Sequence, residues 1–250
     1  MKKEIEKEIR EKLDHPNLIH LIEKKGDKYY LRYQTSLNLP WIYGMEELGK
    51  NRDCNFQNGF LFGYLFEEQQ VPLFCLNCYK VDITLYTVEQ VYAMIDLQSR
   101  LGLDSKTGSE GKRKDSDKRY GAYFYDNSLE AGRATFNLVR QEMFNIQLFV
   151  NELDLSYHDG DMILRKGCSK FATAVGPSDT WREGEHQALI EEVAYSLYGG
   201  PSNNGTPSKL NRAHNKEELL KYAYSCGDKT YLKFTGGVPY YLPPVTYQKE

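Results

Sequence analysis

The stretch "YKVDITLYTVEQVYAMIDLQSRLG", residues 79–102, decides the fold. Its first part, 79–86, alternates apolar and polar side chains, which is typical of a strand with one buried face. Over 88–101 the apolar residues recur at helical spacing instead. Thr87 is suited to cap the start of this helix, and Gly102 is a typical helix end. The stretch therefore predicts a strand that leads directly into an amphipathic helix.

The residues that follow repeat this alternation. We predict a strand over 120–126, a helix over 128–144 with a polar cap before it, and a further strand over 145–153. The resulting β-α-β-α-β unit over about 79–152 indicates an α+β fold, with a mixed β-sheet and helices packed on it. Because the chain shows no internal repeat and no clear domain boundary, 1–250 is interpreted as a single domain.

Two polar segments, 103–119 and 199–214, interrupt this pattern. Both are poor in apolar residues and rich in turn-forming ones, so we expect mobile loops there. The other expected elements are a helix over 2–14, a short helix over 17–22, a strand over 28–34, strands near 59–66, a strand over 161–168, helices over about 186–198 and 215–226, and a strand over 229–234.

Composition limits the class of protein. Of the 250 residues, 40% are hydrophobic and 27% charged, which is ordinary for a soluble globular chain. The net charge of −3 argues against a protein that coats DNA through a global basic field. No apolar run is long enough for a membrane helix, and residues 1–13 lack the apolar core of a secretory signal. Five scattered cysteines argue against a disulfide framework, so we expect a cytoplasmic protein with reduced thiols.

Cys75 and Cys78 form a C-x-x-C pair, which can supply two thiolate ligands from one tight turn. The missing ligands of a metal site would come from Cys54, Cys168, Cys226 or a histidine, and Cys54 with Cys168 is the preferred pair. Zn²⁺ and an iron–sulfur cluster both accept thiolates. Two buried core cysteines are the alternative. A redox dithiol is disfavoured because a strand, not a helix, follows the pair.

A second group of candidates could carry catalysis. His158, Asp159 and Asp161 lie close together in the sequence and could perform acid–base chemistry, and the thiol of Cys168 has basic neighbours that would favour a thiolate. These residues suggest a hydrolase or transferase that acts on a small or nucleotide-like substrate. The alternative is a plain hairpin turn, for which Asp-Gly is a leading sequence.

Tyrosine is abundant, with 20 residues, and three of them lie on the strand predicted over 120–126. Arg133 and Arg140 are seven residues apart and share one face of the predicted helix that follows. Together with Tyr123 they could stack on bases and bind phosphates. Arginines that simply face solvent are the alternative.

These candidates lead to three hypotheses of function. The first is an intracellular protein with a cysteine-ligated metal, acting as a binding or assembly subunit for a protein partner. The second is the hydrolase or transferase. The third is binding of a nucleic acid or nucleotide through the tyrosine and arginine surface. No sequence motif names a reaction, a substrate or an oligomeric state.

Overall fold

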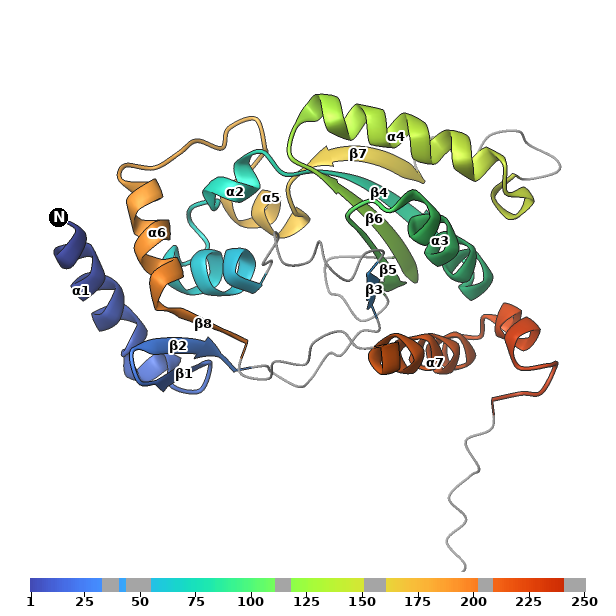
Figure 1. Cartoon of the computed structure of the whole chain (residues 1–250), viewed down its shortest axis with the longest axis horizontal. Coiled ribbons are helices and arrows are strands. Elements are labelled where there is room, and N and C mark those ends of the chain that lie inside the picture. The colour runs from blue at the N-terminus through green and yellow to red at the C-terminus, as the bar shows by residue number, and fades with distance from the viewer. Residues whose placement is uncertain (33–40, 44–54, 111–117, 151–160, 202–208, 241–250) are drawn as a thin grey trace, which may run out of the picture.

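The structure is a computed structural model with an α+β fold, in which helices pack on two β-sheets (Figure 1). This confirms the predicted fold class. The residues it describes are 1–32, 41–43, 55–110, 118–150, 161–201 and 209–240. Within these residues, no helix is both long enough and apolar enough to span a bilayer.

The larger sheet has five described strands, and every neighbouring pair in it is antiparallel. Their spatial order is β3 (Trp41–Tyr43), β5 (Ser105–Ser109), β6 (Tyr120–Asp126), β4 (Tyr79–Leu85) and β7 (Met162–Lys166). Strand β4 pairs along its whole length with β6 and lies between β6 and β7. The strand predicted from the opening stretch is thus confirmed.

Two helices connect these strands by crossing over a neighbour. Helix α3 (Val88–Leu101) runs from β4 to β5, with β6 lying between them, and α4 (Leu129–Phe144) follows β6 and precedes β7, with β4 lying between them. The order β4-α3-β5-β6-α4-β7 is the split β-α-β arrangement called ferredoxin-like. Because this topology hosts many unrelated functions, it assigns none here.

Both helices pack on the same face of the five-stranded sheet (Figure 1). Apolar side chains from alternate strand positions form this core, among them Val81, Ile83, Leu85, Ala122 and Phe124. Within α4, a Cβ on Gly132 would lie 2.9 Å from Leu164 Cδ1, so glycine permits the close approach of the helix to β7. The opposite face of the sheet carries the candidate site.

The predicted helix signals are confirmed in detail. Thr87 Oγ1 accepts a hydrogen bond from the backbone nitrogen of Gln90 at 3.2 Å. Gly102 ends α3 in the left-handed conformation, with φ of 62°. Ser128 Oγ accepts from the backbone nitrogen of Ala131 at 3.1 Å and caps α4.

The unit over 79–152 differs from the prediction in two places. Within the segment predicted as a loop over 103–119, residues 105–109 form β5, whose polar side chains pair with β6. Within the segment predicted as a strand over 145–153, the described residues form a single turn of 3₁₀-helix, η5 (Gln147–Phe149). The five-stranded sheet is therefore antiparallel rather than mixed.

A smaller sheet contains β1 (Ile22–Lys25), β2 (Lys28–Leu31) and β8 (Tyr198–Pro201). Strands β1 and β2 form a hairpin, and β8 pairs with β2 in parallel, so this sheet is the mixed one. A second apolar cluster joins it to α1 (Lys2–Leu13) and α6 (Gln187–Leu197). The predictions of both helices and of the β2 strand are confirmed.

Four further segments adopt structures other than those predicted, and one is β8, whose last residues fall within the loop predicted over 199–214. Residues predicted as a helix over 17–22 instead enter β1 after a 3₁₀ turn, η1 (Pro16–Leu18). The strands predicted near 59–66 are a π-helix, η4 (Asn55–Leu65). The strand predicted over 229–234 is a 3₁₀-helix, η6 (Lys229–Phe234).

The remaining helices are α2 (Leu73–Leu76), α5 (Ser169–Val175) and α7 (Lys209–Ser225). Helix α7 begins six residues before the start predicted at Asn215, and it packs against β3 and β5. Helices α2 and α5 share a third apolar cluster with η4. This third cluster contains two of the cysteines considered as metal ligands, Cys75 and Cys168.

Candidate functional site

The face of the five-stranded sheet opposite α3 and α4 carries polar and aromatic side chains. We call it the polar face. Its residues alternate with the core positions in each strand, and the register sets them side by side. They are Trp41 and Tyr43 on β3, Lys106 and Gly108 on β5, Gly121, Tyr123 and Tyr125 on β6, Lys80, Asp82 and Thr84 on β4, and Ile163 and Arg165 on β7.

Aromatic rings and ammonium groups interleave across β3, β5, β6 and β4. The ring centres of Trp41 and Tyr123 are 5.8 Å apart. The Lys106 ammonium lies 4.3 Å from the centre of the Trp41 ring and 5.4 Å from that of Tyr123. On the other side, the Lys80 ammonium lies 4.8 Å from the Tyr123 ring centre. The Tyr125 ring follows Tyr123 in a stacked orientation, with centres 6.4 Å apart. These contacts fix two cations beside aromatic rings.

A buried carboxylate organises the other half of the polar face. Asp82 is 2% exposed and accepts from two cations, Lys118 Nζ at 2.8 Å and Arg165 Nη2 at 2.6 Å. The side chains of Lys118 and Arg165 are 27% and 29% exposed. The Nε of Arg165 is buried and has no hydrogen-bond partner among the described residues. Arg165 therefore has an unsatisfied buried donor beside the ion pair.

A second carboxylate lies beneath the aromatic residues. The Tyr123 hydroxyl donates to the carboxylate of Glu110, which is fully buried. A Cβ at Gly121 would lie 3.3 Å from Glu110 Oε1 and 3.4 Å from the Tyr123 hydroxyl, so glycine makes room for this hydrogen bond. The bond anchors the Tyr123 ring, which is 3% exposed, against the sheet.

The outer groups of the polar face reach solvent. Trp41, Lys106 and Tyr125 are partly buried, and Tyr43 is 47% exposed. The arrangement thus consists of buried charges and rings that position half-exposed aromatic and cationic groups. Such groups can stack on a planar ring and neutralise an anion in one ligand.

The structure brings three of the proposed metal ligands into one region. Cys75 is buried in α2, and Cys168 packs against its cluster from the start of α5. The backbone nitrogen of Gly167 donates to the carbonyl oxygen of Cys78 at 2.7 Å, which joins the two segments. Cys75 lies in a helical turn rather than in the expected turn between strands. Cys54 lies outside the described residues.

This thiol region contains no complete metal site in the part of the chain that the structure describes. No three histidine, cysteine, aspartate or glutamate residues there are arranged to hold a metal ion. Cys75 and Cys78 are 6% and 8% exposed, as expected of small core side chains.

Of the proposed catalytic residues, the two that the structure describes are not brought together. Asp161 and Cys168 lie beyond opposite ends of β7, whose five residues span about 17 Å. The Asp161 carboxylate accepts from the Tyr86 hydroxyl, and its carbonyl accepts from the backbone nitrogen of Thr84 at 2.7 Å. His158 and Asp159 lie outside the described residues.

Arg133 and Arg140 are exposed on α4, while Tyr123 lies on the polar face. Because α4 packs on the opposite face of the sheet, the two arginines and Tyr123 do not share a surface. The Arg140 guanidinium lies over the Phe144 ring, 5.8 Å from its centre. The cations near Tyr123 are lysines that the sequence did not single out.

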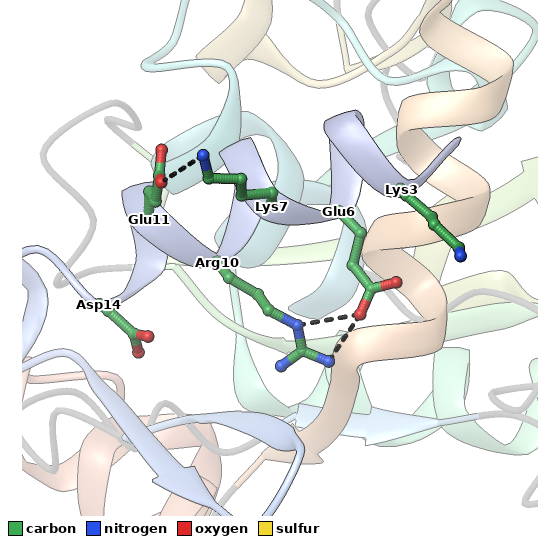
Figure 2. A pocket seen from close by; sticks show the side chains of 6 residues that line it. All are labelled: Lys3, Glu6, Lys7, Arg10, Glu11 and Asp14. Carbon is green, nitrogen blue, oxygen red and sulfur yellow. Dashed lines mark hydrogen bonds and ion pairs between the residues drawn. The ribbon is translucent and has the colours of Figure 1, made fainter. Parts of the chain in front are cut away.

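A shallow hollow along α1 is an alternative candidate site (Figure 2). Most of its charged side chains are already paired within the protein. Arg10 donates to Glu6 at 2.9 and 2.8 Å, Lys7 lies 3.6 Å from Glu11, and Asp14 accepts from Lys24 at 2.6 Å. The polar face combines rings with charges, and it is the stronger candidate. Comparisons with protein-family models, with curated proteins and with solved structures find no match for this chain.

Proposed function

We propose that this protein binds single-stranded nucleic acid on the polar face of its five-stranded sheet. The observation that supports this most directly is the Trp41–Lys106–Tyr123 arrangement, in which an ammonium lies beside two aromatic rings. Sheets that bind single-stranded RNA stack bases on aromatic residues of their strands. Grooves for single strands add cations that follow the backbone.

Charge supports binding of modest strength. Three partly exposed cations lie on or beside the polar face, Lys106, Lys118 and Arg165, but Lys80 is only 4% exposed and Asp82 neutralises part of the charge. The whole chain has a net charge of −3. We therefore expect a dissociation constant of roughly 10 µM at physiological salt, which is in the range of non-specific binding.

Fluorescence anisotropy tests the proposal directly. Labelled oligothymidylate and oligouridylate of about 12 nucleotides would be titrated with the protein at low salt, beside a duplex of the same length. We expect both single strands to bind more tightly than the duplex. In Lys106→Gln, affinity should fall about fivefold near 0.1 M salt, because one phosphate contact is lost.

The matched control removes the same charge from the other side of the sheet. Arg133→Gln and Arg140→Gln leave the polar face intact, so their affinities should equal that of the wild type. No anisotropy change with any oligonucleotide at roughly 100 µM protein, or an equal loss in the α4 variants, would reject the proposal.

A thiol-ligated metal is a second candidate, favoured by the packing of Cys168 against the Cys75 cluster. Zn²⁺ or an iron–sulfur cluster would use Cys75, Cys78 and Cys168, and the protein would then act as a binding or assembly subunit. Metal analysis of protein purified anaerobically without chelator tests it. About one zinc per chain, or about two or four irons per chain, lost in Cys168→Ser, is the supporting result, and metal-free protein excludes the site.

A further inference from the structure

The stacking and anion-binding groups of the polar face lie at opposite edges of the sheet. Trp41 and Tyr43 are on the edge strand β3, and Arg165 is on the edge strand β7. Neighbouring strands are about 4.8 Å apart, so the two edges are separated by about 19 Å. The strands between these edges carry Lys106 on β5, Tyr125 on β6 and Lys80 on β4.

The β3 edge is suited to a base. Tyr43 is 47% exposed. The Trp41 ring is partly buried and makes a cation–π contact with the Lys106 ammonium. A base that stacks here would place its own phosphate close to Lys106.

The β7 edge is suited to a phosphate. Arg165 and Lys118 converge on Asp82, and the buried Nε of Arg165 has no hydrogen-bond partner among the described residues. A guanidinium binds phosphate through paired donors in one plane, so Nε is the donor that a phosphate oxygen would use.

We infer that the ligand is an oligonucleotide that crosses the strands from β3 to β7, with a base at Trp41 and a backbone phosphate at Arg165. This inference rests on the proposed function and adds the size and path of the ligand. A stacked strand rises about 3.4 Å per nucleotide, and comparable sheets stack two or three bases. The span of at least about 19 Å therefore corresponds to a footprint of at least about six nucleotides.

Competition by unlabelled oligothymidylates measures this footprint. A labelled strand of about 12 nucleotides is bound to the protein, and competitors of one to about eight nucleotides displace it. We expect the competitor affinity to rise by at least about tenfold between one nucleotide and the footprint length, since each added stacked base contributes. Beyond that length the competitor affinity should rise only in proportion to the number of positions along the longer strand at which the protein can bind.

A pair of variants tests the path across the sheet. For a competitor of about six nucleotides, Trp41→Leu and Arg165→Gln should each weaken binding, and their effects should multiply. A dinucleotide reaches only one edge, so one of the two substitutions should leave its affinity unchanged. Arg165 is 29% exposed and glutamine is a shorter, neutral side chain, so the stability of Arg165→Gln is measured by urea denaturation beside the titration, and this arm gives a second readout if Trp41→Leu folds poorly.

The outcomes separate the two proposals. A mononucleotide that competes as well as the longer strands overturns the crossing path but leaves binding on the polar face intact. An Arg165→Gln variant that binds every length like the wild type also overturns it. Absence of binding at all lengths rejects the proposed function itself.

Discussion

The ammonium of Lys106 lies 4.3 Å from the centre of the Trp41 ring, across the β3–β5 pair. The same ammonium is 5.4 Å from the Tyr123 ring centre on the next strand. One lysine therefore connects aromatic residues from two strands that are not neighbours. The two cation–π contacts restrict the Lys106 side chain against the aromatic rings.

The first prediction concerns the salt dependence of binding. The logarithm of the association constant should fall linearly with the logarithm of salt concentration, and Lys106→Gln should reduce that slope by about 0.7, because one phosphate contact is removed. Anisotropy titrations over a salt series measure the slope. An unchanged slope in Lys106→Gln would show that this ammonium does not face a phosphate.

The second prediction concerns the buried carboxylate of Asp82. Asp82→Asn should lower the free energy of unfolding by about 1–3 kcal/mol, because Lys118 and Arg165 lose their charged acceptor. Urea denaturation measures the change. Asp179 is exposed, so Asp179→Asn should stay within about 0.5 kcal/mol of the wild type. Equal stabilities of the two variants would contradict the role given to Asp82.

The third prediction concerns Asp228, which joins three elements. Its carboxylate accepts from the backbone nitrogen of Val88 at 2.6 Å, from the Tyr120 hydroxyl at 3.0 Å and from Thr230 Oγ1 at 2.7 Å. Asp228→Ala should cost at least about 2 kcal/mol, because these buried donors lose their acceptor. Asp228→Asn keeps one acceptor oxygen and should cost less. The order of the two urea midpoints checks this.

The fourth prediction concerns alkaline pH. The hydrogen bond to Asp161, with a smaller effect of burial, raises the pKa of Tyr86 to about 12. An unfolded chain would release this proton near pH 10. The contribution of Tyr86 to stability is therefore fully present below pH 10 and is lost between about pH 10 and 12.

Urea unfolding at about pH 9 and about pH 11 tests the effect of Tyr86. The lower pH lies below the transition, and the higher pH lies within it. Tyr86→Phe should lose less stability between the two pH values than the wild type does. Tyr92→Phe is an informative comparison, because burial raises the pKa of Tyr92 to about 12 as well. If Tyr86→Phe and the wild type lose the same stability between the two pH values, the hydrogen bond to Asp161 does not raise the pKa of Tyr86.

Much of the fold follows from local signals in the sequence. Helices α3 and α4 were predictable because Thr87, Gly102 and Ser128 satisfy the backbone groups at their ends. Strand β5 was missed because the sequence "SKTGS", residues 105–109, has no apolar alternation. Its side chains are buried only because α3 and α7 pack over them, which is a long-range effect.

The opposite error occurred at η6. The sequence "KTYLKF", residues 229–234, has the alternation of a strand, but Asp228 caps it as a 3₁₀-helix through the backbone nitrogen of Thr230 at 3.0 Å. A cap of this kind competes locally with strand pairing. Tertiary contacts of Asp228 with Tyr120 and Val88 then fix the choice.

The candidate site was only partly predictable. Tyr123 was identified, but its partners Lys80 and Lys106 were not, because they come from strands whose pairing the sequence does not state. Arg133 and Arg140 seemed close to Tyr123 along the chain, yet helix and strand residues of one unit face different sides of the sheet. Cross-strand register, rather than sequence distance, decides which side chains meet.

Tryptophan fluorescence tests the binding face most directly. The chain has two tryptophans, and Trp181 is 4% exposed in the third apolar cluster, so the signal that Trp41→Phe removes belongs to the polar face. We predict that unlabelled oligothymidylate quenches the emission of the wild type, that Trp41→Phe shows no quenching, and that Arg133→Gln behaves like the wild type. Unchanged wild-type emission at saturating oligonucleotide, or equal quenching in Trp41→Phe, would contradict binding on this face.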